Sequence, residues 1–221
     1  NDRFIEYGMK PDLFIVKSRN DNYRPGWFDS VRGFKNVLWS SRTAIQNNAS
    51  SYPEDPTSTG ITVNNDDGQT NQNTKTYVGW AFKAGGNNNT FNVDDVGYAS
   101  AAAAGLTGGD ITPTGASVGT KQGFSIIKFT GSASGTPSIP HGLSEAPNFI
   151  AQKDTGATTS WRVFMYNGTT WSIMNFDDAS GAQGATETAP TSSLFYANGN
   201  GNAANTQIAY LWHDVPGLQK F

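Results

Sequence analysis

The sequence contains no cysteine. It can therefore form no disulfide, and it offers neither a thiolate nucleophile nor a Cys-based zinc site. Histidine is almost as scarce, because only His141 and His213 are present and neither has a metal-ligand partner at the usual spacing. A zinc centre or a catalytic triad has little support, and we expect a non-enzymatic protein with no catalytic residue.

Charge is also scarce. Charged residues make up 15% of the chain, below the roughly 25% of an ordinary soluble domain, and the net charge is −3. No more than two basic residues stand side by side, so we expect no nucleic-acid partner. No apolar run approaches the roughly 18 residues that cross a bilayer, so we expect no membrane span.

The main positive feature is an internal repeat. Residues 5–17 and 139–153 share a Gly-containing turn, a proline, an apolar pair and a final lysine. A tryptophan segment follows each copy, at Trp27 and at Trp161, and a strand-like signature comes later at 76–83 and at 206–213. In that signature large and small residues alternate, which is typical of a central strand in a sandwich.

These patterns predict an all-β fold of two tandem antiparallel β-sandwich-like domains, of the lectin or jelly-roll kind. We assign residues 1–86 to a first repeat that is incomplete at its N-terminus and residues 123–221 to a second repeat. Residues 87–122 are rich in Gly, Ala, Asn and Thr and are expected to form a linker, with at most one helical turn. Trp80, Phe82, Tyr210 and Trp212 recur at equivalent strand positions, and we expect them on buried faces.

Several short motifs resemble a repeat of bacteriophage tail-fibre-like virion proteins, particularly those of marine cyanophages. The markers are Gly-Phe-Ser-Ile at 123–126 with Phe-Thr-Gly at 129–131, His-Gly-Leu at 141–143 before Pro147, and Tyr-Val-Gly-Trp at 77–80 with Lys-Ala-Gly-Gly at 83–86. Two departures are Tyr7 in place of the turn histidine and Gln152 at a strand position that is usually apolar.

The resemblance implies a structural protein located in the virion, in a tail or tail fibre. It implies a homo-oligomer whose partners are copies of itself and neighbouring tail proteins, with contact to the host surface as its role. The alternative is a carbohydrate-binding, lectin-like adhesion module that holds a host-surface glycan on a fibre or a bacterial surface protein. The two differ in whether the loop aromatics are exposed or buried at subunit contacts.

The aromatic residues carry the candidate ligand or subunit contacts, because sugar rings stack on exposed Trp and Tyr. We select the five that are flanked by polar stretches, namely Trp27, Trp39, Tyr52, Trp171 and Tyr196. The adjacent carboxylates at 66–67, 94–95 and 177–178 are expected to be solvated loop acids, because neighbours on an extended chain point to opposite sides. We expect no cofactor, although residues 64–68 and 92–95 leave calcium open, without the spacing of an EF-hand.

Overall fold

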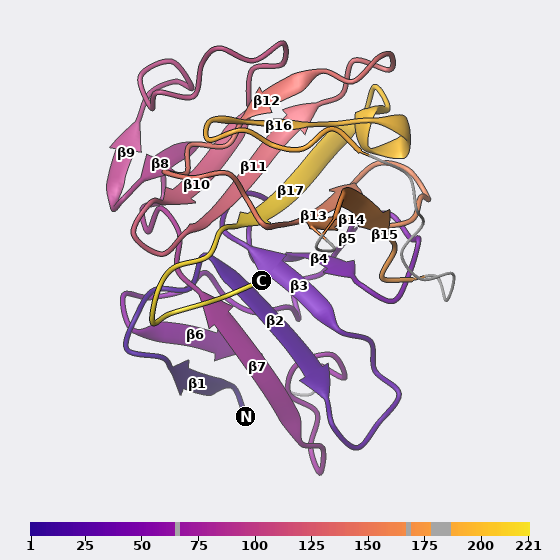
Figure 1. Ribbon diagram of the computed structural model, residues 1–221. Helices are drawn as coiled ribbons and strands as arrows, with labels where there is room; N and C mark the ends of the chain where they lie inside the picture. The colour runs from indigo at the N-terminus through magenta and orange to yellow at the C-terminus, as the bar shows by residue number, and fades with distance from the viewer. Residues whose placement is uncertain (65–66, 167–168, 178–186) are drawn as a thin grey trace.

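The structure is a computed structural model, which describes residues 1–64, 67–166, 169–177 and 187–221. Their regular secondary structure consists of β-strands apart from one short 3-10 helix, which confirms the predicted all-β class (Figure 1). The strands before residue 100 are β1 (Arg3–Glu6), β2 (Leu13–Ser18), β3 (Gly26–Asp29), β4 (Asn36–Trp39), β5 (Asn47–Asn48), β6 (Gly60–Val63), β7 (Tyr77–Phe82), β8 (Phe91–Val93) and β9 (Val96–Tyr98).

The remaining strands are β10 (Gly115–Gly119), β11 (Phe124–Thr130), β12 (Ser138–Pro140), β13 (Phe149–Asp154), β14 (Arg162–Tyr166), β15 (Trp171–Met174), β16 (Leu194–Tyr196) and β17 (Thr206–Trp212). A short 3-10 helix, η1 (Gly199–Asn202), precedes β17. Within the described parts of the chain, no helix is long and apolar enough to cross a membrane.

Two large sheets dominate the described structure. One has five strands in the order β5-β4-β3-β2-β7, and the other has eight in the order β15-β14-β13-β17-β11-β10-β8-β9. Two small sheets, β1-β6 and β12-β16, accompany them. Figure 1 shows the five-stranded sheet in the lower half of the molecule and the eight-stranded sheet in the upper half.

The two large sheets pack against each other through a shared core. Alternate residues of each strand point into it, as the period of a β-strand requires. The core joins Leu13, Trp27 and Leu38 of the smaller sheet to Phe124, Ile126, Ala151, Ile208, Tyr210 and Trp212 of the larger one, with Trp161 beside them. The molecule is thus a β-sandwich whose halves share one apolar interface.

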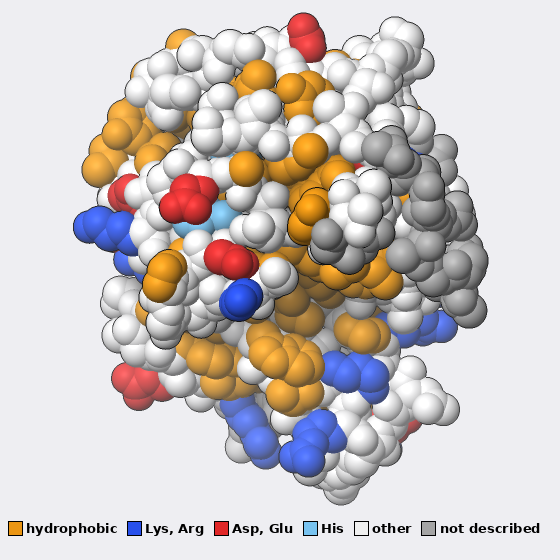
Figure 2. Space-filling model, in the orientation of Figure 1, with side chains coloured by type: hydrophobic (Ala, Val, Ile, Leu, Met, Phe, Trp, Pro, Cys, Tyr) orange, Lys and Arg blue, Asp and Glu red, His pale blue; other side chains and the backbone are white. Residues whose placement is uncertain are grey.

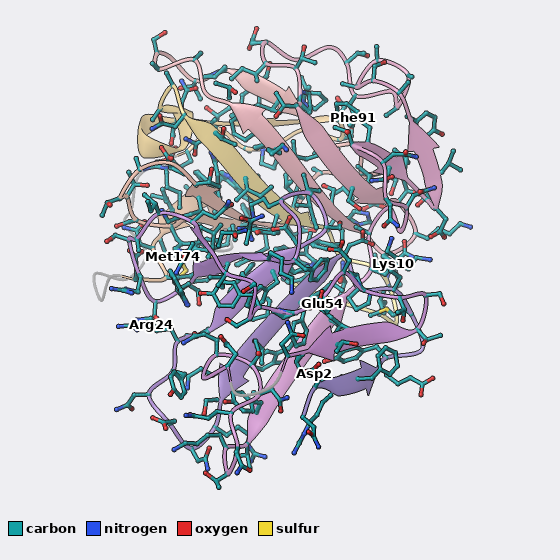
Figure 3. The ribbon with its side chains drawn as sticks, turned by 180° about the vertical axis from the view of Figure 1, so that it is seen from behind. Asp2, Lys10, Arg24, Glu54, Phe91 and Met174 are labelled. Carbon is teal, nitrogen blue, oxygen red and sulfur yellow. The ribbon has the colours of Figure 1, made fainter. Side chains whose placement is uncertain are left out.

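The outer face of each large sheet is covered by a small one. On the five-stranded side, Ile61 of β6 packs with Phe14 and Phe28. On the eight-stranded side, Phe195 of β16 packs on Phe129 with 5.8 Å between ring centroids. From behind, Phe91 lies in the upper half and Asp2 in the lower half, so the layers lie one above the other in this view (Figure 3).

The two halves share one pattern of strand pairing. β2 lies between β3 and β7, and β13 lies between β14 and β17. Both copies of the turn contain a glycine with positive φ, Gly8 at 68° and Gly142 at 72°. The two final lysines, Lys17 and Lys153, each donate to the backbone carbonyls one and four residues further along. The turn glycines and the final lysines of the two sequence copies therefore occupy equivalent structural positions.

Residues 87–122 differ from the expected linker. They include β8, β9 and β10, and β10 pairs antiparallel with β11 over five residue pairs, so this segment extends the eight-stranded sheet. Near its centre, the Ala104 N–H donates to the Ser100 carbonyl at 3.1 Å in a turn. The segment is built into the fold because β11 offers it a free edge, a long-range effect that local composition does not reveal.

Candidate functional site

An open groove lies where the two large sheets diverge. It has a volume of about 490 Å³, and its wall is mostly aromatic and aliphatic, with two serines. The lining residues are Ile15, Pro25, Trp27, Ser40, Ser41, Trp80, Phe82 and Phe176. Figure 2 shows hydrophobic side chains gathered on this face of the molecule, in the zone between the upper and lower halves.

Trp80 is the exposed wall of this groove. It belongs to β7 and pairs with Ile15 of β2, and 47% of its surface is accessible. The equivalent residue of the other half, Tyr210, pairs with Ala151 and is fully buried. The expectation of a buried Trp80 is therefore wrong, because the side chain points toward the inter-sheet core but lies beyond the part that the eight-stranded sheet covers.

The five aromatics selected from the sequence do not gather at one site, although Trp39 and Tyr52 belong to the same core cluster. Trp27, Trp39, Tyr52 and Trp171 are 5–9% exposed, and Tyr196 is half-buried in β16. Only Trp27 lines the groove, where it forms the floor. Burial of four of the five inside this single chain removes them as a flat sugar-stacking platform.

Each of the other four has a structural position. Trp39 donates its indole N–H to Gln69 Oε1 at 3.1 Å, and the Tyr52 ring packs edge-on against Phe28 with 5.4 Å between centroids. Trp171 belongs to the core of the eight-stranded sheet, and Tyr196 pairs with Ser138.

Trp27 and Trp161 contact each other across the inter-sheet core, with 5.1 Å between ring centroids. Their strand positions differ, however. Trp27 pairs with Ile15, whereas in the second half the residue at that register is Val163, opposite Ala151. Trp161 therefore lies two residues before the position that matches Trp27, and the two side chains contact each other in one cluster.

A buried polar cluster fastens the two large sheets together. The Tyr210 hydroxyl donates to Asp29 Oδ2 at 2.7 Å, and the Arg32 guanidinium donates to the same oxygen at 2.6 Å. Arg32 also donates to the Tyr210 oxygen at 3.1 Å and to the Trp27 carbonyl at 3.0 Å. Burial raises the pKa of Tyr210 well above its ordinary value, so the hydroxyl remains a donor. Each of these three side chains is therefore hydrogen-bonded to the other two.

His141 has a similarly fixed role. Its Nδ1 accepts the Leu143 N–H at 3.1 Å, so the other ring nitrogen, Nε2, carries the proton and faces the Thr191 carbonyl at 3.1 Å. Burial lowers the pKa of His141 to about 4. The ring is therefore neutral at pH 7 and stabilises the turn that leads to β13.

The acidic pairs do not form a catalytic dyad in the described part of the chain. Asp94 and Asp95 occupy the tight turn between β8 and β9 with φ of 48° and 69°. Asp94 accepts the Thr120 N–H at 2.9 Å, whereas Asp95 forms an ion pair with Lys83 at 2.8 Å. The two carboxylates therefore have separate partners.

The other two acidic pairs are described only in part. Asp66, Asp178 and residue 65 of the calcium hypothesis lie outside the described residues. Asp67 accepts the Gln69 N–H at 2.8 Å, and Asp177 accepts the Trp161 N–H at 3.1 Å. Across the described ranges, no group of three or more His, Asp or Glu is placed to hold a metal ion.

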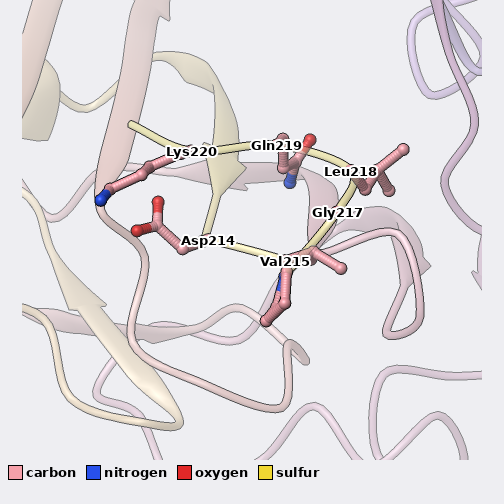
Figure 4. Close-up of a pocket in the computed structure, with 7 residues that line it drawn as sticks. Asp214, Val215, Gly217, Leu218, Gln219 and Lys220 are labelled. Carbon is pink, nitrogen blue, oxygen red and sulfur yellow. The ribbon is translucent and has the colours of Figure 1, made fainter.

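A second hollow lies at the C-terminal turn, 214–220 (Figure 4). Gln219 fixes the turn, because its side-chain amide donates to the carbonyls of Gln122, Gly123 and His213 at 2.8–3.1 Å. Asp214 accepts the Phe221 N–H at 2.8 Å. These contacts hold the turn against the start of β11.

A family model spans residues 1–221, and its description is "Domain of unknown function (DUF7483)". The chain belongs to the DUF7483 family. No curated protein matches it, and no solved structure does. Membership of DUF7483 extends over both halves of the sandwich, so the family unit includes the shared core and the groove beside Trp80.

Proposed function

We propose that this DUF7483 chain is a structural component of a bacteriophage tail or tail fibre. It acts by contact rather than by catalysis, packs with copies of itself and with neighbouring virion proteins, and contributes to attachment to the host surface. In this proposal the chain is built from two copies of one repeat.

The duplication of strand pairing carries the proposal. In each half, a two-stranded sheet (β1-β6 or β12-β16) covers a larger one, and the pairing β3-β2-β7 recurs as β14-β13-β17. The motifs that resemble phage fibre repeats occupy these elements: residues 123–131 coincide with β11, and the turn at 141–143 leads into β13. Repetition of this kind suits a protein whose role is position and contact.

The buried polar groups also favour this function. The Asp29, Arg32 and Tyr210 side chains bond to one another, and His141 bonds to backbone groups. Polar side chains used in this way specify a rigid fold and are not available for proton transfer.

Immunogold labelling tests the proposal directly. Antibodies raised against residues 1–221 are expected to decorate the tails or fibres of virions whose genome encodes the chain. Intact and disrupted virions should be compared, so that an epitope hidden in the assembly is also reached. Absence of label from both preparations, with the antibody active on the purified protein, contradicts a virion role.

Carbohydrate binding is the second candidate, and the exposed Trp80 favours it. An indole that is 47% exposed beside serine hydroxyls is the combination on which a sugar ring can stack and hydrogen-bond. Binding of purified host-surface polysaccharide to the labelled chain is expected to be saturable and to be lost in Trp80→Ala. Phe4→Ala is the matched control, because Phe4 is also 50% exposed but lies in β1, outside the groove. Equal binding by both variants would exclude the groove as the glycan site.

A further inference from the structure

The strands β7 and β17 hold the same place in their two halves. The last residue of each strand accepts an equivalent backbone hydrogen bond from the residue directly before the central strand. The Asp12 N–H donates to the Phe82 carbonyl at 2.8 Å, and the Asn148 N–H donates to the Trp212 carbonyl at 2.7 Å. Each strand runs antiparallel to its central neighbour, β2 or β13. The surroundings of β17 therefore indicate what the corresponding side of β7 can accommodate.

The two strands differ on the side away from that neighbour. β17 is paired there with β11 over seven residue pairs, whereas β7 is the last strand of its sheet (Figure 1). All residues of β17 except the first are buried, whereas every residue of β7 is half-buried or exposed. Trp80 is the extreme case, at 47% against 0% for Tyr210. Lack of a second neighbour thus adds to the exposure of β7, beside the limited extent of the opposing sheet at Trp80.

The backbone of β7 is oriented for pairing on this free side. The carbonyls of Thr76 and Phe82 accept bonds from the β2 side, both at 2.8 Å. Because successive residues of a strand alternate their bonding direction, Tyr77, Gly79 and Ala81 turn their N–H and C=O groups away from β2. The equivalent residues of β17 face β11. An edge that pairs with no strand among the described residues is a template for strand addition.

Side chains beside the edge also favour an apolar strand. In the second half, Phe124 of β11 stacks on Trp212 with 4.6 Å between centroids, and Ile126 lies opposite Tyr210. Next to the end of β7 there is a hollow of about 360 Å³ with a mostly apolar lining and three polar residues. The lining residues are Met9, Ala81, Phe82, Phe124, Leu218 and Phe221, with Lys83, Gln122 and Gln219. A strand with the β11 pattern would place its first aromatic residue at this hollow and its next same-face residue, an isoleucine, beside Trp80.

We propose that the free edge of β7 accepts an extended β11-type strand from a second polypeptide of the same family. The strand adds antiparallel to β7, with its Phe124-like residue opposite Phe82 and its Ile126-like residue opposite Trp80. It extends the five-stranded sheet and covers the exposed indole. This inference deepens the proposed structural role by naming one contact and rests on it only for its biological setting, because the pairing can be measured on the isolated chain.

Peptide binding tests the inference. A fluorescein-labelled peptide with the sequence of residues 123–131 is titrated with the full chain, and its anisotropy is measured. In β11, Gly123 and Gly131 bond to the β17 side and Lys128 bonds to the β10 side, so Ser125 and Ile127 carry the N–H groups that would face β7. N-methylation of these two residues is expected to weaken binding at least about tenfold, because two backbone bonds are lost.

The controls locate the site. A peptide N-methylated at Ile126 and Lys128, whose N–H groups face away, is expected to bind within about threefold of the unmodified peptide. Ala81→Pro removes an outward N–H of β7 and should abolish binding, whereas Ala81→Ser retains that N–H and should preserve it. Folding of both variants is checked by near-UV circular dichroism, and the two N-methylated peptides test the inference on the unaltered chain if Ala81→Pro does not fold.

Three results would overturn the inference. These are no saturable binding of the unmodified peptide, equal weakening by both N-methylation patterns, and undiminished binding to a folded Ala81→Pro variant. The last would place the peptide elsewhere, for example in exchange with β11 itself. None of these results depends on virion labelling, so this contact and the tail function can fail separately.

Discussion

Replacing Tyr210 by phenylalanine removes one oxygen from the contact between the two large sheets. The hydroxyl donates to Asp29 Oδ2 at 2.7 Å and accepts from the Arg32 guanidinium at 3.1 Å, and all three groups are buried. Hydrogen bonds to charged groups contribute about 1.5–3 kcal/mol each, and the phenyl ring keeps the packing with Trp27. We therefore expect Tyr210→Phe to lower the free energy of unfolding by about 3 kcal/mol.

A matched control separates this effect from loss of any tyrosine hydroxyl. Tyr77 is half-buried, and its oxygen accepts the Gln72 N–H at 3.0 Å and donates to the Gly68 carbonyl at 3.1 Å. Both partners are neutral and belong to the same half of the chain, so Tyr77→Phe should cost about 1 kcal/mol.

Urea unfolding followed by tryptophan fluorescence and far-UV circular dichroism gives both values. The two probes should report a single transition, because the sheets share one core. If Tyr210→Phe costs no more than Tyr77→Phe, the buried cluster does not stabilise the inter-sheet contact and the argument from its geometry is wrong.

Three further predictions concern single side chains. Burial lowers the pKa of His141 in the folded state to about 4, against an ordinary 6.5, so the neutral ring contributes its full stability above pH 6.5 and this contribution is lost as the pH falls toward 4. Urea titrations at a series of pH values measure this loss. By pH 4, the free energy of unfolding of the wild type should have fallen by about 3 kcal/mol more than that of His141→Gln. Gly142→Ala should reduce the melting temperature more than Gly8→Ala, because both residues have positive φ but only at Gly142 would the new methyl group approach another side chain, at 2.8 Å; equal shifts would contradict the steric argument. Asp12→Ala leaves four donors without their acceptor and should lower the free energy of unfolding by about 3 kcal/mol or more. The Asn148 side chain accepts only one N–H, so Asn148→Ala should lower it by about 1 kcal/mol. Chemical denaturation compares the two variants, and equal losses would refute this reasoning.

The all-β class was predictable because strand signals dominate the sequence and long amphipathic patterns are missing. The positions of β2 and β13 could also be predicted from the sequence, because each strand follows a proline and ends one residue after a lysine. Local patterns gave the direction in which Trp80 points, but they could not show how far the opposing sheet extends, and this decides its exposure.

Other features depend on contacts between distant segments. β10 contains two glycines and becomes a strand because it pairs with β11. The salt bridge between Asp29 and Arg32 has a recognisable spacing of three residues, yet its third member, Tyr210, is 178 residues from Arg32. No local signal predicts such a partner.

The Asp12 carboxylate has a consequence for how the two halves transmit force. One oxygen accepts the N–H groups of Ala84 and Gly86 at 2.7 and 3.0 Å, and the other accepts the hydroxyls of Ser30 and Ser117 at 2.9 Å. A single buried group directly before β2 thus bonds to both ends of the segment that connects the two halves. It bonds to Ala84 and Gly86 at the beginning of this segment and to Ser117 of β10 near its end. We therefore expect this connection to be rigid and not to act as a hinge, so that the two halves respond to an applied force as one body.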